Sequence, residues 1–251
     1  MIIVYALFFF IFGLVFGSFF NVVGLRVPKG ESIVSPPSHC TNCQRRLTTR
    51  DLVPVLSFLF LKGKCRNCET KIHWVYPLTE FVTAFLFTLA YLELGLNPEL
   101  IIALLFISLL IIITVSDIAY MLIPNKILLV FGVLLVVGRF FIQSNPWWDS
   151  IVGAFGGFLI LLLVAILSKG GIGGGDIKLF FIIGLVLGIY STLLALFLAS
   201  VIGLIVGVVL LNYRKQGRKT PIPFGPSIAL ASIITYFYGE QILEWYMNLL
   251  F

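Results

Sequence analysis

Charged residues are scarce in this sequence. Only 11% of its 251 residues are Asp, Glu, Lys or Arg, whereas 60% are hydrophobic and the mean hydropathy is +1.09. A soluble domain would have roughly a quarter of its residues charged. The composition therefore excludes an ordinary soluble protein and indicates that most of the chain lies in a lipid bilayer.

The N-terminal segment lacks the features of a cleavable secretory signal. No Lys or Arg precedes its apolar core at residues 1–23, and no small-residue cleavage pattern follows it. The core is also longer than that of a typical signal peptide. We therefore expect this segment to remain as a membrane anchor.

Nucleotide-binding motifs are also absent, although residues 170–176 are dense in glycine. This stretch has neither the Gly-Lys-Ser/Thr ending of a P-loop nor the Gly-x-Gly-x-x-Gly spacing of a dinucleotide-binding fold. What glycine supplies here is backbone freedom and close approach. We expect a substrate strand to lie against Gly173, Gly174 and Gly175, held beside Asp176 by main-chain hydrogen bonds. A flexible turn between two helices is the alternative.

Long apolar runs make up most of the remaining sequence. At about 20 apolar residues per spanning helix, they predict an all-α membrane protein with about eight transmembrane helices. The runs lie at approximately residues 2–23, 77–94, 99–116, 126–142, 151–168, 177–189, 192–211 and 226–239. The sixth run is short, and we expect it to continue into the seventh with little or no loop.

The distribution of charge between the loops predicts how the helices are oriented. Lys and Arg gather in residues 26–76 and 212–220. The loops on the other side contain five acidic residues and a single basic one: Glu93, Glu99, Asp149, Glu240, Glu244 and Arg139. By the positive-inside rule, the basic loops are cytoplasmic and both termini are outside. The net charge of +6 follows from this topology and requires no nucleic-acid partner.

The four cysteines of the chain all lie in one polar insert, residues 26–76. They form two Cys-x-x-Cys knuckles separated by 21 residues: Cys40, Cys43, Cys65 and Cys68. This spacing is typical of a four-thiolate zinc ribbon. Two disulfides are the alternative, but the cytoplasm keeps thiols reduced. The sequence therefore predicts a cytoplasmic zinc-binding insert between a first helix at residues 1–25 and a helical bundle at residues 77–251.

Two aspartates are candidates for catalysis because carboxylates at membrane depth are costly and rare. Asp117 follows the apolar run at residues 100–116, and Asp176 ends the glycine-rich stretch. The predicted topology places both at the cytoplasmic face. Two such carboxyl groups can share one proton and activate a water molecule for peptide hydrolysis. The alternative is a pair of interfacial aspartates, one capping a helix and one in a turn.

Glu80 is a third acidic residue near the cytoplasmic interface, at the start of the run at residues 77–94. It is a candidate for pairing with a basic residue of the insert or for contacting a cationic substrate. A carboxylate favoured by the helix dipole explains its position equally well.

Several separated motifs resemble those of the type IV prepilin peptidases and occur in the same order as in that family. The resemblance covers nearly the whole chain. The matching motifs include both cysteine knuckles, Asp117 and Asp176. The other matching segments are residues 17–23, 51–57, 63–66, 76–80, 123–125, 173–179 and 223–226.

The resemblance implies an intramembrane aspartic protease of the Gly-x-Gly-Asp class with Asp117 and Asp176 as its dyad. The substrate that the resemblance implies is a prepilin or pseudopilin of a pilus, a secretion system or a DNA-uptake system, with a short basic leader before a long apolar helix. The resemblance also implies a bacterial cytoplasmic membrane location and N-methylation of the new N-terminus with S-adenosylmethionine as methyl donor. This second activity has no support in the residues beyond the intact four-cysteine insert.

A proton-coupled membrane transporter is the alternative function, with Asp117 and Asp176 relaying protons. It would be expected to have inverted repeats and broken helices near the membrane midplane. The sequence shows no internal repeat, and both carboxylates lie at the ends of apolar runs. These features favour the peptidase over the transporter. A catalytically silent zinc-bearing scaffold is a third possibility, and the intact pair of aspartates argues against it.

Overall fold

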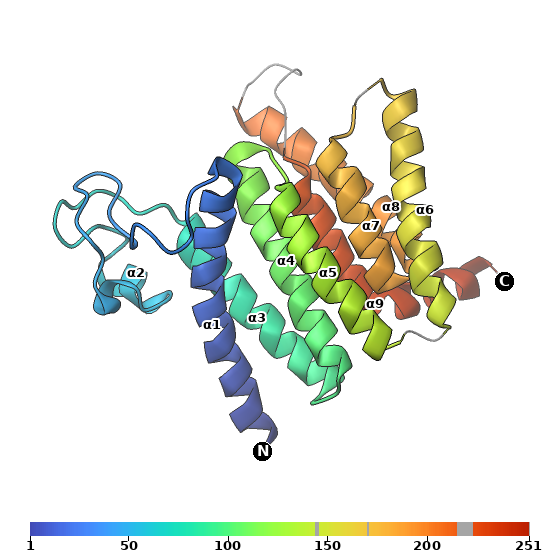
Figure 1. The fold of residues 1–251 in the computed structure, drawn as a ribbon, viewed down its shortest axis with the longest axis horizontal. Helices are drawn as coiled ribbons and strands as arrows, with labels where there is room; N and C mark the ends of the chain where they lie inside the picture. Colours follow the sequence, from blue (N-terminus) through green and yellow to red (C-terminus); the bar gives the residue numbers. More distant parts are fainter. Residues whose placement is uncertain (144–145, 170, 215–222, 251) are drawn as a thin grey trace. The chain divides into compact units, whose positions relative to one another are not determined.

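The structure is a computed structural model that describes residues 1–143, 146–169, 171–214 and 223–250 (Figure 1). Over these ranges the regular structure is helical, with two isolated β-bridges and no strand. The α-helices are α1 (Ile2–Arg26), α2 (Leu56–Phe60), α3 (Val75–Leu94), α4 (Glu99–Tyr120), α5 (Asn125–Phe141), α6 (Trp147–Leu167), α7 (Gly174–Leu187), α8 (Ile189–Arg214) and α9 (Gly225–Leu250). Two short 3-10 helices are η1 (Val27–Lys29) and η2 (Thr49–Asp51). The all-α prediction is confirmed.

Each predicted apolar run corresponds to one long helix, but some ends differ. Asp117 lies in the last turn of α4, which continues to Tyr120 rather than ending before the aspartate. Likewise, α9 continues to Leu250, past its predicted end at residue 239. Good helix formers such as alanine, glutamate and glutamine extend a helix beyond its most apolar part. As predicted, almost no loop separates α7 from α8, because only Gly188 (φ 76°) lies between them.

Five helical segments in the described ranges are long and apolar enough to cross a membrane: Ile2–Lys29, Val75–Leu94, Glu99–Tyr120, Trp147–Leu167 and Ile189–Val209. By contrast, α5 has 17 residues and α7 has 14. At about 1.5 Å per residue α7 is roughly 21 Å long, which is less than the ~30 Å hydrocarbon core of a bilayer. The structure therefore supports a multi-pass membrane protein, while the number of eight spans is not confirmed.

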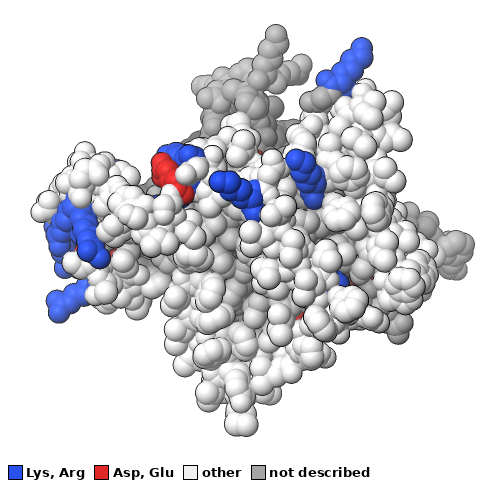
Figure 2. All heavy atoms as spheres, viewed as in Figure 1, with Lys and Arg blue, Asp and Glu red and all other residues white. Residues whose placement is uncertain are grey.

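Charged side chains occupy few places on the face of the molecule that Figure 2 draws. Lys and Arg are concentrated there on the insert and near the ends at which α5 and α7 begin. The basic residues Lys215, Arg218 and Lys219 and the glycine Gly170 lie outside the described residues.

The chain forms two compact units, Met1–Val115 and Ser116–Phe251, and their boundary falls within α4. In the first unit, α1 packs against α3 through glycines. A Cβ atom on Gly13 would lie 2.5 Å from Cα of Ala84, and one on Gly17 would lie 2.7 Å from Cα of Glu80. Such small residues let two membrane helices approach closely.

In the second unit, α6 packs against α7 in the same way, with Gly153 and Gly184 in direct backbone contact. The break between α7 and α8 is held by two charged side chains. Arg139 Nη2 donates to the Val186 carbonyl at the end of α7 (2.8 Å), and Asp149 Oδ1 accepts from the Ile189 N–H that begins α8 (3.1 Å). Each charge complements the helix end that it contacts. This end of α7 is therefore fixed, and its other end carries Asp176.

Candidate active site and metal centre

Asp117 is buried in the last turn of α4, where its side chain is only 7% exposed. Its Oδ2 atom accepts a hydrogen bond from the backbone N–H of Gly225, the first residue of α9, at 2.7 Å. The chain leaves α4 at Met121, which has a positive φ of 53°, and Ser116 Oγ donates to the Leu122 carbonyl at 2.6 Å. The Asp117 carboxylate is thus positioned by its own helix α4 and by the start of α9, which are far apart in the sequence.

Asp176 lies in the first turn of α7, after the N-terminal cap residue Gly173. Its backbone N–H donates to the Gly173 carbonyl at 3.1 Å. An acidic residue in the first turn of a helix is favoured by the helix dipole. The Asp117 and Asp176 carboxylates are close enough to interact electrostatically. The structure therefore brings the two candidate catalytic residues together within the second unit.

The three glycines before Asp176 have different surroundings. A Cβ atom on Gly175 would lie 2.7 Å from Cβ of Ile123, whereas one on Gly174 would meet nothing within 4 Å. A Cβ atom on Gly173 would lie 3.1 Å from Oδ2 of Asp176. Gly175 is therefore required for close packing, and the open backbone is at Gly174. The predicted contact of these glycines with a substrate strand stays a prediction.

The segment between α4 and α5 connects the elements that carry the two aspartates. Ile123 packs against Gly175, and Asn125 Oδ1 accepts a hydrogen bond from Lys178 Nζ at 2.8 Å. The sequence did not predict that Lys178 is the partner of Asn125, because a single polar residue at a helix start does not specify a long-range contact.

Glu80 lies in the first unit, in the second turn of α3, and is 9% exposed. Its Oε2 atom accepts a hydrogen bond from the backbone N–H of Val55 at 2.7 Å. Val55 has a positive φ of 59° and immediately precedes α2 in the insert. The partner that the insert supplies is thus a backbone N–H, and the contact of Glu80 with a cationic substrate stays a prediction. A buried carboxylate is stabilised by such a charge-assisted hydrogen bond.

The four cysteines converge as the spacing predicted. Their sulfur atoms all lie within 4.8 Å of one another, with 3.7 Å between Cys40 and Cys68 and 4.0 Å between Cys43 and Cys65. Four thiolates at about 2.3 Å from a tetrahedral zinc ion would be about 3.8 Å apart. The residues present therefore fit a metal ion of this kind.

The two knuckles share one backbone geometry. In each, the first cysteine donates its N–H to a carbonyl five residues later (2.9 Å in both), and the residue after the second cysteine has a positive φ. Those two residues are Gln44 (φ 57°) and Glu69 (φ 54°). Asn42 Nδ2 donates to Thr70 Oγ1 at 2.8 Å and thereby joins the knuckles. Neither residue was predicted from the sequence, since the link depends on how the two turns face each other.

Charged and polar neighbours surround the cysteine cluster. Arg66 Nε lies 2.8 Å from Asp51 Oδ1, and this hydrogen bond lowers the pKa of Asp51 to about 2. The pKa of Cys68 is lowered to about 5, chiefly because the Thr70 side chain and backbone hydrogen-bond to its sulfur. A local hydroxyl and N–H thus favour the thiolate form that a metal ion requires.

Two family signatures match the sequence. The Bacterial Peptidase A24 N-terminal domain matches residues 11–94, and the Type IV leader peptidase family matches residues 104–208. The first signature contains Glu80 and the four cysteines, and the second contains both aspartates.

Curated relatives extend the match to nearly the full length. A protein from Bacillus subtilis (strain 168) is 45% identical over 240 residues, which cover 96% of this chain and 97% of the relative. Relatives from Aeromonas salmonicida (strain A449) and Pseudomonas putida are each 32% identical to this chain. The two matches extend over 273 and 267 residues, which are 92% and 93% of the length of the respective relative. All three are named prepilin leader peptidase/N-methyltransferase. No solved structure matches the chain. The chain therefore belongs to the type IV leader peptidase family.

Proposed function

We propose that this protein cleaves the leader from type IV prepilins or pseudopilins and then N-methylates the new N-terminal residue. The observation that carries the proposal is that the segments bearing Asp117 and Asp176 meet, since Ile123 after α4 packs against Gly175 beside Asp176 and the two carboxylates interact. Relatives in the family are named for the two proposed activities. Carboxyl groups that interact in this way can divide the roles of base and acid between them.

The proposed hydrolysis uses one aspartate as carboxylate and the other as carboxylic acid. The carboxylate takes a proton from water, and the water oxygen attacks the carbonyl carbon of the scissile bond. The protonated aspartate polarises the carbonyl oxygen. When the C–N bond breaks, the aspartate that took the proton from water gives it to the departing amine and becomes a carboxylate again. The Gly225 N–H holds the Asp117 carboxylate in one orientation during these steps.

The open backbone at Gly174 supports a path for the substrate. An extended segment lying against Gly174 meets no side chain there, and its main chain can hydrogen-bond to the loop. At the neighbouring Gly173 it reaches the carboxylate of Asp176. Gly175 supports the same loop from behind through its contact with Ile123. In this proposal, Glu80 acts on the substrate indirectly, by holding the insert through Val55.

The proposed topology has eight spans, with the insert and the dyad on the cytoplasmic side of the bacterial cytoplasmic membrane. Its support is the concentration of Lys and Arg in the insert and in the segment at residues 212–220. The short helices α5 and α7 require bilayer thinning or hydration at their ends, which suits carboxylates that must reach water.

We further propose that the four cysteines hold a structural zinc ion. It would stabilise an insert that has little core of its own, since the cysteine Cys65 is its only buried hydrophobic residue among those described. S-adenosylmethionine, when bound, would supply the methyl group. The residues that bind it are not assigned.

The decisive experiment is incubation of the purified protein with a prepilin and S-adenosylmethionine, followed by mass spectrometry of the mature N-terminus. We expect a product that starts directly after the leader and carries one methyl group. A proton-coupled transporter, the second function considered, would leave the prepilin intact. Intact prepilin in the presence of zinc-loaded protein would therefore refute the peptidase.

A further inference from the structure

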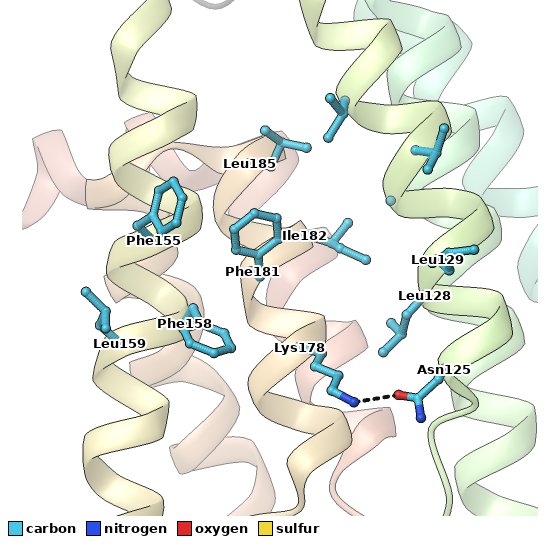
Figure 3. A pocket seen from close by; sticks show the side chains of 13 residues that line it. Asn125, Leu128, Leu129, Phe155, Phe158, Leu159, Lys178, Phe181, Ile182 and Leu185 are labelled. Carbon is cyan, nitrogen blue, oxygen red and sulfur yellow. Dashed lines mark hydrogen bonds between the residues drawn. The ribbon is translucent and has the colours of Figure 1, made fainter.

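An apolar groove runs along the second unit between α5 and α6, with α7 as its floor (Figure 3). Its volume is about 680 Å³. Ile182 and Leu185 of α7 are buried beneath it. The walls are exposed instead, since Leu129 on α5 is 71% exposed and Leu159 on α6 is 57% exposed. The groove is therefore open along its side.

The polarity of the groove changes only at one end. Among its 13 lining residues, Asn125 and Lys178 alone are polar. They are hydrogen-bonded to each other at 2.8 Å and both lie at the start of their helices. Figure 3 shows this pair at one end and aromatic and aliphatic side chains along the rest. The groove thus suits an occupant that is apolar along its length and polar at one end.

The polar end of the groove adjoins the candidate active site. Lys178 follows Asp176 by two residues in the first turns of α7, and Asn125 belongs to the segment that packs against Gly175 through Ile123. A chain that lies in the groove and leaves it at this end therefore arrives at the glycine loop and the aspartates.

The dimensions match a helix better than a compact ligand. Along α5 the lining residues extend from Asn125 to Val136, which is about 17 Å at about 1.5 Å per residue. This length corresponds to roughly three helical turns. Gly132 lies in the middle and has only Ile182 within reach, at 3.4 Å from a Cβ position. The absent side chain leaves room there for the surface of another helix.

We propose that this groove binds the membrane-embedded apolar helix of the substrate, with the junction to its polar leader at the Asn125–Lys178 end. The inference rests on the proposed function and extends it with a docking surface. Laying an apolar helix into an apolar groove is a recurring recognition mode. Here, binding of the substrate helix in the groove would place the scissile bond at the same membrane depth as the two aspartates. Lipid tails and a second copy of this chain are the competing occupants.

Site-specific photocrosslinking tests the occupant directly. A benzophenone amino acid at Val133, which lines the groove and is 57% exposed, is compared with one at Leu134, which is 44% exposed and does not line it. The Asp176→Asn background prevents turnover of the bound prepilin. We expect crosslinks to prepilin from position 133 and not from 134. Crosslinks from 133 to lipid alone, or to a second copy of the chain, would overturn the proposal.

Kinetics provide the second test, with a matched pair of exposed residues on α5. Leu129→Trp fills the groove, whereas Val130→Trp adds the same side chain outside it. For full-length prepilin, Leu129→Trp should raise KM about tenfold, or about 1.4 kcal/mol, with little change in kcat. A leader peptide that ends shortly after the scissile bond should show the same KM with every variant.

These outcomes separate the groove from the catalytic proposal. Equal KM values for Leu129→Trp and Val130→Trp with full-length prepilin would refute the groove while cleavage still supports the peptidase. Protein that carries the benzophenone amino acid at position 133 and both aspartates, and that crosslinks prepilin but never cleaves it, would refute the peptidase and retain the docking surface.

Discussion

The carboxylate of Asp117 accepts a hydrogen bond from the backbone N–H of Gly225 at 2.7 Å, and a Cβ atom on Gly225 would lie 2.8 Å from that same carboxylate oxygen. The first residue of α9 therefore both orients a candidate catalytic group and must lack a side chain to do so. This contact explains why the segment at residues 223–226 and Asp117 belong to one site although they are far apart in the sequence.

Replacing that glycine should impair catalysis. Gly225→Ala should lower kcat by roughly 10²-fold, because the methyl group displaces the Asp117 carboxyl group from the position in which it acts on the water or on the scissile carbonyl. Single-turnover cleavage of prepilin measures the effect. Leu230→Ala, an exposed position on the same helix, serves as control and should behave like wild type. Unchanged turnover in a folded Gly225→Ala protein would remove this residue from the site.

Each aspartate of the dyad should be essential. Asp117→Asn and Asp176→Asn should each lower the cleavage rate by roughly 10⁴-fold or more, because neither residue can transfer a proton as an amide. Asp149→Asn is the matched control, since Asp149 contacts Ile189 at the other end of α7. It should retain cleavage. A dyad variant with near-normal turnover would lose its assignment.

The cysteine cluster should contain one zinc ion per chain, as measured by elemental analysis of the purified protein. Cys40→Ser or Cys65→Ser should release the ion and lower the melting temperature of the insert. His39→Ala, a change of a potential ligand outside the sulfur cluster, should leave zinc in place.

Because the insert is separate from the dyad in sequence, the cysteine variants should lose more methylation than cleavage. Equal losses in a stably folded variant would make the insert a general structural support.

Loss of the Glu80 carboxylate should loosen the insert. Glu80→Ala leaves the Val55 N–H without its acceptor and should cost about 1.5–3 kcal/mol. Glu80→Gln keeps an acceptor oxygen and should cost less. Limited proteolysis within residues 30–70 measures the difference. Identical cleavage patterns for wild type and Glu80→Ala would show that other contacts hold the insert.

The Asp51–Arg66 contact should make the insert sensitive to acid. The pKa of Asp51 is lowered to about 2 by Arg66, compared with about 3.9 for an unfolded chain. A depressed pKa stabilises the folded state above the unfolded value, and this stabilisation is lost as the pH falls from about 4 toward 2. The melting temperature should therefore fall more steeply in that window for wild type than for Asp51→Asn. Parallel curves would contradict the assignment.

The sequence by itself determined the features that depend on local pattern. Long apolar runs form helices, because a helix pairs the backbone groups of a membrane span within the segment itself. Each Cys-x-x-Cys knuckle is a tight turn whose geometry is set by neighbouring residues, and the spacing of the four cysteines predicted that the two knuckles share one site. Asp117 and Asp176 stand out because carboxylates between apolar runs are rare. None of these inferences requires knowing which helix packs on which.

Only the tertiary structure decided which groups meet. The acceptor of the Gly225 N–H, the backbone partner of Glu80 and the Asn125–Lys178 pair all join residues that are distant in the sequence. The groove likewise exists because α5 and α6 flank α7 without filling the space above Ile182. Such relationships follow from helix packing, and packing depends on side-chain shape summed over whole faces. The spacing of residues along one helix does not specify how the faces of two helices fit together.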